Sequence, residues 1–316
     1  MVQRAQLEAQ TAGAVARLVP VWKLRSVRQT IKAIFCYAML IGVGLIIVLP
    51  ISWMLTAALK GDDETVFTLP PSWIPTTSWH FENFYRSFVI AAYPLWRYTL
   101  NTIFLVVVNV IGRLFSCALV AYPFARLRFP GRDFLFSIMI ATMLIPYPVI
   151  LVPQFLLYNA IGWYGTYLPL IVPAFTGGAY LVFLVRQYMR SIPLELDDAA
   201  RIDGCSYFGI FWRIILPLSG PVLVVVMVFT FLGVWNDFMG PLVYLVRQEQ
   251  FTLAVGLQYF KESVHGGQGT GVSNVYNIKW NLMMAATLLS ILPVLAVYFS
   301  VQNQLIGGIA SVGIKG

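Results

Sequence analysis

Few side chains in this 316-residue sequence have the types and spacing that chemistry needs. The two histidines, His80 and His265, lie far apart, and neither has a Cys, Asp or Glu at the spacing of a metal site. Cys36 and Cys117 fall in apolar stretches and Cys205 in a polar one, so we expect small buried residues rather than a disulfide framework. No Gly-x-x-x-x-Gly-Lys-Ser/Thr motif occurs. We therefore predict a non-catalytic chain that itself binds no metal, nucleotide or other cofactor.

Two charges lie where lipid would penalise them, which makes a functional role the first hypothesis. Asp237 follows Trp235 and Asn236 in a long apolar stretch, and its carboxylate can bond hydroxyl groups of a solute or nearby backbone. A structural hydrogen bond, or a kink at 240–241, explains Asp237 equally well. For Arg113, a side chain that snorkels to the surface or an ion pair within a helix bundle outweighs a role in binding solute. Because the two residues are predicted at different depths, we do not pair them.

The composition indicates that membrane helices position these residues. Hydrophobic residues make up 59% of the chain and charged residues 11%, with a mean hydropathy of +0.77, whereas soluble domains have about 25% charged residues. Because about 20 apolar residues cross a bilayer, we predict an all-α polytopic fold with six transmembrane helices. The spans are expected at 33–59, 98–122, 134–157, 167–189, 219–245 and 281–303. A basic leader (1–32) precedes this transmembrane domain (33–303), and a short tail (304–316) follows it.

Prolines and glycines mark the irregular parts of the chain. Pro146, Pro148 and Pro153 interrupt the third span, and neighbouring helices or water must satisfy the carbonyls that they free, so we expect this span to face the bundle interior. The glycine cluster at 266–271 follows no predicted strand and opens no predicted helix. It therefore indicates a flexible outer loop rather than a phosphate-binding loop.

The distribution of basic residues predicts the orientation. With six alternating spans, most Lys and Arg residues fall on the same side as the leader, and by the positive-inside rule this side is the cytoplasm. Both termini are then cytoplasmic. The net charge of +8 and the pI near 9.4 follow from this asymmetry and require no nucleic acid.

The segment 191–217, between the fourth and fifth spans, is patterned as two helices joined by a turn. Acidic residues at 195–198 favour the positive end of a helix dipole, and Gly204 supplies a left-handed stop. Ser206 is a suitable N-cap for the second helix. Its apolar face is expected to consist of Phe208, Phe211, Trp212 and Ile215. We predict a helix–turn–helix element on the cytoplasmic side, with aromatic side chains to bury.

This segment resembles the cytoplasmic signature of the membrane-spanning (permease) subunits of bacterial ATP-binding-cassette importers. That signature is Glu-Ala-Ala, three residues, Gly, nine residues, then Ile-x-Leu-Pro. The sequence keeps every spacing, with Asp198-Ala199-Ala200, Gly204, Ile214, Leu216 and Pro217, and departs only in having Asp198 for Glu. Weaker similarities occur at 82–85, 122–126 and 162–167, and the end at 308–316 resembles the second permease of maltose-type carbohydrate importers. An ordinary amphipathic loop is the alternative.

The resemblance implies an importer permease of the type I fold, in the bacterial cytoplasmic (inner) membrane, that carries a sugar or oligosaccharide. It implies a second permease, two ATPase subunits that would hold ATP and Mg²⁺, and an extracytoplasmic solute-binding protein as partners. The residues expected to couple to the ATPase are Glu195, Asp198, Ala199, Ala200, Asp203, Gly204, Phe208, Phe211, Trp212, Ile214, Leu216 and Pro217. Sugar-carrying members have a run similar to 235–238, so the expected substrate-path residues are Trp235, Asn236, Asp237 and Arg113.

Two other classes of protein compete with this interpretation. An ion-coupled secondary transporter of a small polar solute usually needs several carboxylates within its spans, and only Asp237 is found. A membrane enzyme needs a cluster of carboxylates or histidines at one interface, which is absent from the sequence. Whether the sugar is neutral or acidic stays open.

Overall fold

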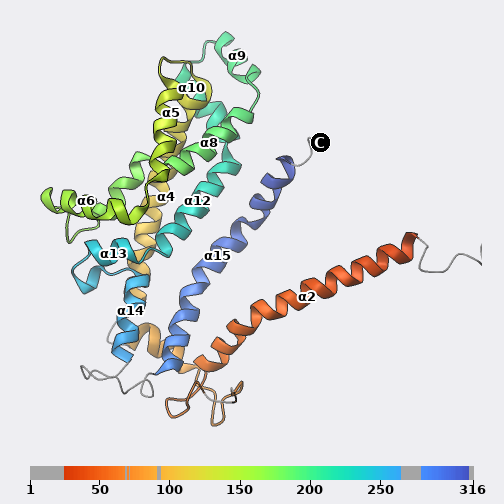
Figure 1. Ribbon diagram of the computed structural model, residues 1–316, viewed down its shortest axis with the longest axis vertical. Coiled ribbons are helices and arrows are strands. Elements are labelled where there is room, and N and C mark those ends of the chain that lie inside the picture. Colours follow the sequence, from red (N-terminus) through yellow and green to blue (C-terminus); the bar gives the residue numbers. More distant parts are fainter. Residues whose placement is uncertain (1–24, 68–69, 71, 91–93, 265–278, 313–316) are drawn as a thin grey trace, which may run out of the picture.

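The computed structural model describes residues 25–67, 70, 72–90, 94–264 and 279–312, and every regular element in these ranges is helical (Figure 1). The glycine cluster at 266–271, His265 and most of the leader lie outside the described residues. The α-helices are α2 (Arg25–Ala58), α3 (Glu82–Tyr85), α4 (Leu95–Arg126), α5 (Arg132–Ala141), α6 (Tyr147–Ala160), α7 (Leu168–Ile171), α8 (Ala179–Ser191), α9 (Glu195–Ile202), α10 (Tyr207–Ile210), α11 (Leu216–Leu218), α12 (Gly220–Trp235), α13 (Met239–Tyr244), α14 (Leu253–Val264) and α15 (Trp280–Val312). Short π-helical turns η2 (Arg86–Ile90) and η5 (Phe211–Ile215), and 3-10 turns η3 (Thr142–Leu144), η4 (Val172–Thr176) and η6 (Gln248–Gln250), connect them.

Four of the described helical segments are long and apolar enough to cross a membrane, and six if each sharply bent pair counts as one span. This confirms the predicted all-α polytopic fold; the cytoplasmic placement of the termini stays a prediction. The first and last helices are longer than expected. α2 begins at Arg25, within the predicted leader, and α15 continues to Val312, within the predicted tail.

The third predicted span is broken in the region of its prolines, as expected, and consists of two helical pieces that meet at a sharp bend. α5 with η3 and then α6 are bent by 100° at the break before Tyr147. Proline disfavours helical backbone in the residue before it, and both Ile145 (ψ 116°) and Pro146 (ψ 139°) are extended. Figure 1 shows α6 leaving the side of the bundle. The fourth and fifth predicted spans are also interrupted, at Gly177–Gly178 before α8 and at 236–238 between α12 and α13.

Two hydrophobic cores lie along α4. The inner core surrounds Cys117, Ala121 and Tyr122, and packs α4 against α8, α12 and the segment from α9 to η5. The outer core surrounds Leu95, Tyr98 and Val106, and packs α4 against α12, α14 and α15. The part of α4 between the two cores, residues 107–116, is therefore the place where the bundle has room for a cavity.

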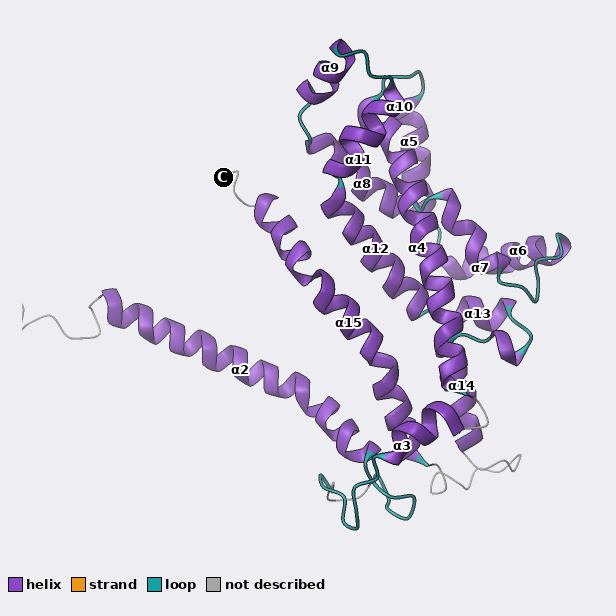
Figure 2. Cartoon of the chain, turned by 180° about the vertical axis from the view of Figure 1, so that it is seen from behind, coloured by secondary structure: helices purple, strands orange, loops and turns teal. Residues whose placement is uncertain are grey.

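α2 stands apart from this bundle. It approaches α15 only near its C-terminal end, and both views of the molecule show it diverging from there (Figures 1 and 2). Its side chains from Ile31 to Leu49 are almost all exposed, whereas Ala57 and Ala58 are buried. A helix that is apolar on every side needs lipid or another membrane helix around it.

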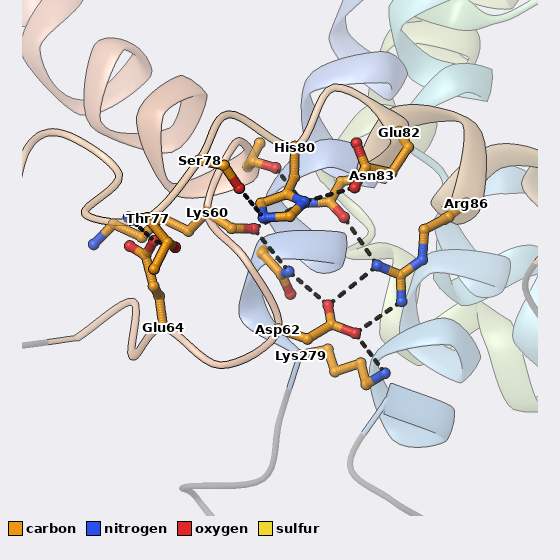
Figure 3. Close-up of polar contacts among 12 residues, drawn as sticks. Lys60, Asp62, Glu64, Thr77, Ser78, His80, Glu82, Asn83, Arg86 and Lys279 are labelled. Carbon is orange, nitrogen blue, oxygen red and sulfur yellow. Dashed lines mark hydrogen bonds and ion pairs between the residues drawn. The ribbon is translucent and has the colours of Figure 1, made fainter.

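A polar cluster holds the outer end of α2 against the start of α15 (Figure 3). The carboxylate of Asp62 accepts hydrogen bonds from Arg86 Nη2 (2.8 Å), Lys279 Nζ (2.8 Å) and Asn281 Nδ2 (2.9 Å). The hydrogen bond from Arg86, helped by those from Lys279 and Asn281, holds the pKa of Asp62 well below its usual range. Buried Asn83 donates to the carbonyls at positions 58 and 60 (2.9 and 2.8 Å). The segment 82–85, one of the weaker family similarities, therefore has a structural role, because it bonds the chain at and just after the end of α2.

Candidate functional site

The helix–turn–helix element at 191–217 projects from one end of the bundle, with α9 outermost (Figure 1). α9 carries three acidic residues in its first turn and Arg201 in its last, as the helix dipole favours. Gly204 follows with φ +82°, a left-handed conformation that only glycine adopts without strain. Ser206 Oγ accepts from Gly209 N (3.2 Å) and caps α10. These local predictions are confirmed.

α4 holds the element from both sides through two side chains one turn apart. Arg126 Nη2 donates to the carbonyl of Ile192 (2.9 Å), and Arg126 Nε lies 3.7 Å from Asp197 Oδ2. The side chains of Arg126 and Asp197 are 0% and 3% exposed. Tyr122 donates its hydroxyl to the carbonyl of Tyr207 (3.0 Å). Tyr122 and Arg126, in the segment 122–126 that resembles the family, therefore form a clamp that fixes this element to α4.

Burial imposes a desolvation cost on Arg126 and Asp197, and the attraction between their opposite charges offsets part of it. Arg126 Nε and Nη1 and Asp197 Oδ1 are buried without a hydrogen-bond partner among the described residues. Burial raises the pKa of Asp197, and the positive charge of Arg126 opposes that rise. Loss of either side chain would leave the other charge buried without its counter-charge, so the two residues act as a unit.

The structure divides the predicted coupling residues into exposed and buried sets. Phe208 and Trp212 are exposed (65% and 53%) and available to a partner, whereas Phe211 is buried against Tyr122, with ring centroids 5.1 Å apart. The apolar face predicted for Phe208, Phe211, Trp212 and Ile215 is therefore divided, with Phe211 and Ile215 in the inner core of this chain and the other two side chains exposed. Ala200 is also buried in the inner core of this chain, so its small size serves that packing rather than the approach of a partner.

The remaining coupling candidates fall on both sides of this division. Exposed members are Glu195, Asp198, Ala199, Asp203, Gly204 and Pro217, and the partly buried members are Ile214 and Leu216. Three exposed apolar side chains of the element were not among the predicted coupling residues: Ile202 (87% exposed), Tyr207 (58%) and Leu194 (58%). The sequence contained a signal for these exposed side chains, because apolar residues at the end of a charged helix have no core of their own in which to be buried. The clamp of Arg126 and Asp197 was also missed, because it joins residues far apart in the sequence.

A cavity of about 600 Å³ lies between the two cores. α4, α8 and α12 form much of its wall, and the breaks before α6, α8 and α13 complete it. Polar side chains on the wall include Asn109, Arg113, Tyr147, Gln154 and Asp237. A cavity of this size with a few polar groups on an apolar wall suits a small polar solute.

The residues of the run 235–238 differ in whether they line this cavity. Asp237 lines the cavity and accepts a hydrogen bond from Gly240 N (3.0 Å), so it also caps α13. Trp235 is buried elsewhere, with its indole N–H on the carbonyl of Ser290 (3.2 Å), and Asn236 bonds back to the carbonyl of Leu232 (2.9 Å). Of the three, only Asp237 lines the cavity, and a role of these residues in a substrate path stays a prediction.

Arg113 lines the cavity rather than snorkelling to the surface. Its Nη1 lies close to Gly178, at 2.8 Å from where a Cβ at that position would be, so the guanidinium sits at the start of α8. Arg113 and Asp237, treated as unrelated in the sequence analysis, share one cavity wall but form no ion pair. What either residue does to a substrate stays a prediction.

Comparisons with known proteins agree with this geometry. The family described as "Binding-protein-dependent transport system inner membrane component" matches residues 115–309. The arabinooligosaccharides transport system permease protein AraQ of Halalkalibacterium halodurans is 33% identical over 70% of this chain and 75% of its own. The probable ABC transporter permease protein YurM of Bacillus subtilis is 29% identical over 91% of this chain and 89% of its own. A solved structure of a bacterial ABC transporter that imports the acidic polysaccharide alginate has a chain that matches with a TM-score of 0.74 and 24% identity, over 90% of this chain and 99% of that one.

An all-α chain with membrane-crossing helices, a cavity between them and a helix pair projecting at one end defines a membrane transport subunit. This chain belongs to the inner membrane components of binding-protein-dependent transport systems. It is accordingly an inner-membrane permease, as predicted. The match with the alginate transporter extends the agreement to the fold of nearly the whole chain.

Proposed function

We propose that this chain is one of two membrane-spanning halves of an ATP-driven importer of an oligosaccharide. We further propose that it receives its conformational stroke from separate ATPase subunits through residues 191–217. The substrate class is supported by the relatives, of which AraQ is named for arabino-oligosaccharides. The polar side chains on the cavity wall are of the kinds that bond sugar hydroxyls.

One observation carries this proposal: a single helix reaches both the cavity and the projecting element. α4 presents Arg113 to the cavity and, further along, Tyr122 and Arg126 to the clamp. The clamp leaves little freedom between α9 and α4, because both of its charged side chains are buried and the inner core fills the space around them. A displacement of α9 therefore moves α4, and α4 forms part of the cavity wall.

The ATPase is proposed to contact the exposed apolar side chains at the tip of the element. Ile202, Phe208 and Trp212 are exposed at 87%, 65% and 53%, and large apolar side chains in such a position mark contact sites. ATP and Mg²⁺ would be held by the ATPase subunits, and substrate would arrive on an extracytoplasmic binding protein. Alternating access then follows if the ATPase pair makes different contacts with this element in its closed and open states.

The test is ATP-dependent uptake by the complete complex reconstituted in liposomes. We expect uptake of an oligosaccharide that requires ATP and the binding protein, and that is lost in an Ile202→Asp variant because a charge replaces an apolar contact. Ile74→Asp is a matched control, since Ile74 is also exposed (66%) but lies outside the element. Uptake driven by an ion gradient without ATP would contradict the proposal, and so would full uptake by the Ile202→Asp variant.

A further inference from the structure

The cavity contains a positive charge that the protein does not neutralise. Arg113 lies in the middle of α4, between the two cores, at a depth where an unpaired charge is costly. In the part of the chain that the structure describes, no carboxylate lies within ion-pair distance of Arg113, and no described group accepts a hydrogen bond from its side chain. An internal ion pair is therefore absent from the described residues, and the guanidinium lies on the cavity wall beside Gly178.

The nearest carboxylate on the same wall is already engaged. Asp237 Oδ1 accepts from the backbone of Gly240 at the start of α13. Asn109 and Gln154 each donate one side-chain N–H, to Leu105 O (2.8 Å) and Tyr158 Oη (2.9 Å). Their oxygens, with Asp237, provide acceptors for hydroxyl groups, whereas Arg113 is the cationic donor on the wall.

The start of α8 adds to the positive potential at the same place. Gly178, Ala179 and Leu181 line the cavity beside Arg113, and no side chain caps this helix. The first N–H groups of a helix lack partners within it and carry a partial positive charge. They reinforce the guanidinium, which remains the group that would contact a ligand directly.

We propose that the solute carried by this chain is an acidic saccharide, and that Arg113 binds its carboxylate in the cavity. The inference rests on the proposed function and names the substrate class of the same site. A neutral sugar needs hydrogen-bond partners, which Asn or Gln supply at much lower cost in a membrane. A guanidinium instead presents paired donors whose geometry matches a carboxylate. The oxygens of Asn109, Gln154 and Asp237, which line the same cavity, are acceptors for the hydroxyls of the uronic acid ring.

A carboxylate fits this cavity better than a phosphate ester. A phosphate monoester carries about −1.5 to −2 charge at neutral pH, and one guanidinium leaves much of that charge unmatched. The carboxylate of Asp237 on the same wall repels the excess. A uronate carries a single negative charge, which Arg113 balances.

The test uses the complete complex with its binding protein in liposomes and a fixed set of probes. These are trigalacturonate and trimannuronate, their carboxyl-reduced neutral counterparts, arabinotriose and glucose 6-phosphate. The variants are Arg113→Gln and Arg113→Lys, with Arg97→Gln as the matched control, because Arg97 is an exposed arginine on the same helix. We expect ATP-dependent uptake of a uronide, much weaker uptake of its reduced counterpart, and a loss of roughly tenfold or more in Arg113→Gln, as for a lost hydrogen bond to a charged group. Arg113→Lys should restore part of the uptake, and Arg97→Gln should behave as the unmodified chain.

Each other result overturns a specific statement. Uptake of the neutral trisaccharides at least equal to that of the uronides refutes the acidic substrate and leaves the oligosaccharide importer standing. Uptake of glucose 6-phosphate in place of the uronides refutes the carboxylate. ATP-dependent uptake of no saccharide in the set refutes the proposed function itself. The preference of the unmodified complex for acidic over reduced probes decides the matter even if an Arg113 variant fails to assemble.

Discussion

Replacing Arg126 by methionine should release the projecting element from α4 while leaving the rest of the bundle folded. The change removes the hydrogen bond from Arg126 Nη2 to Ile192 O and leaves the buried carboxylate of Asp197 without its counter-charge. Removing one partner of a buried pair costs roughly 3–5 kcal/mol. The 3.7 Å separation is too long for a hydrogen bond, so the lower end of that range, about 3 kcal/mol, applies. This corresponds to a shift of roughly 100-fold towards the released element, at tenfold for every 1.4 kcal/mol.

The direction of the pH dependence follows from the pKa of Asp197, which burial raises above its ordinary value of 3.8. A carboxyl group whose native pKa is raised stabilises the fold most when protonated, and this contribution is lost as the pH rises through the raised pKa. Without Arg126 the opposing charge is gone and the pKa rises further. The coupling of the Arg126→Met variant should therefore weaken as the pH rises above the ordinary pKa of a carboxyl group.

The assay is the number of ATP molecules hydrolysed for each solute molecule imported by the reconstituted complex. We expect this ratio to rise in Arg126→Met and to fall back towards normal in the double variant with Asp197→Leu, because an apolar pair can replace a buried ion pair. Arg128→Met is the matched control, since Arg128 is exposed and only two residues away. Normal coupling in Arg126→Met, or a double variant worse than both single variants, would refute the reasoning.

The other predictions concern packing and the outer polar cluster. Asp62→Asn should lower the free energy of unfolding by about 1–2 kcal/mol, discounted for the 34% exposure of the Asp62 side chain. Because the pKa of Asp62 is depressed in the folded protein, its contribution to stability is present above its unfolded pKa and is lost only as the pH falls through the lower native pKa. The difference in thermal stability between Asp62→Asn and the unmodified chain should therefore be constant from pH 5 to 8. A difference that vanishes by pH 5 would contradict the assignment. Gly256→Ala should destabilise the outer core by about 1–3 kcal/mol, because its Cβ would lie 2.1 Å from Tyr98 Cδ2. Gly44→Ala on α2, where nothing lies within 4 Å of the added atom, is the control, and equal melting temperatures for the two variants would refute this packing.

Local rules predicted much of this structure from the sequence. The long apolar runs specify membrane helices because a bilayer requires a minimum length of apolar chain, and this holds without knowledge of neighbours. Gly204 and Ser206 were assigned correctly because a left-handed stop and an N-cap depend only on nearby backbone.

Contacts between distant residues could not be predicted in the same way. Phe211 is buried against Tyr122 while Trp212 beside it is exposed, and the apolar periodicity alone cannot tell which aromatic side chains pack on this chain's own helices. The pair Arg126–Asp197 joins two helices, so its charges looked like an exposed loop and an exposed helix end. Arg113 and Asp237 share a cavity because breaks before α6, α8 and α13 open space between the cores, and the prolines and glycines at those breaks predicted kinks without their direction.

The most direct test of the central claim is a cross-link from the tip of α9 to the ATPase. The variant Ile202→Cys is made in a background with Cys36→Ala, Cys117→Ala and Cys205→Ala, so that it carries one thiol, and Ile74→Cys serves as the matched exposed position. We predict that the Ile202→Cys chain forms a cross-link with the ATPase subunit whose yield changes when ATP is added, and that the Ile74→Cys chain forms none. Labelling of Ile202→Cys by an impermeant thiol reagent added outside intact cells, or no cross-link to the ATPase in the assembled complex, would contradict the account.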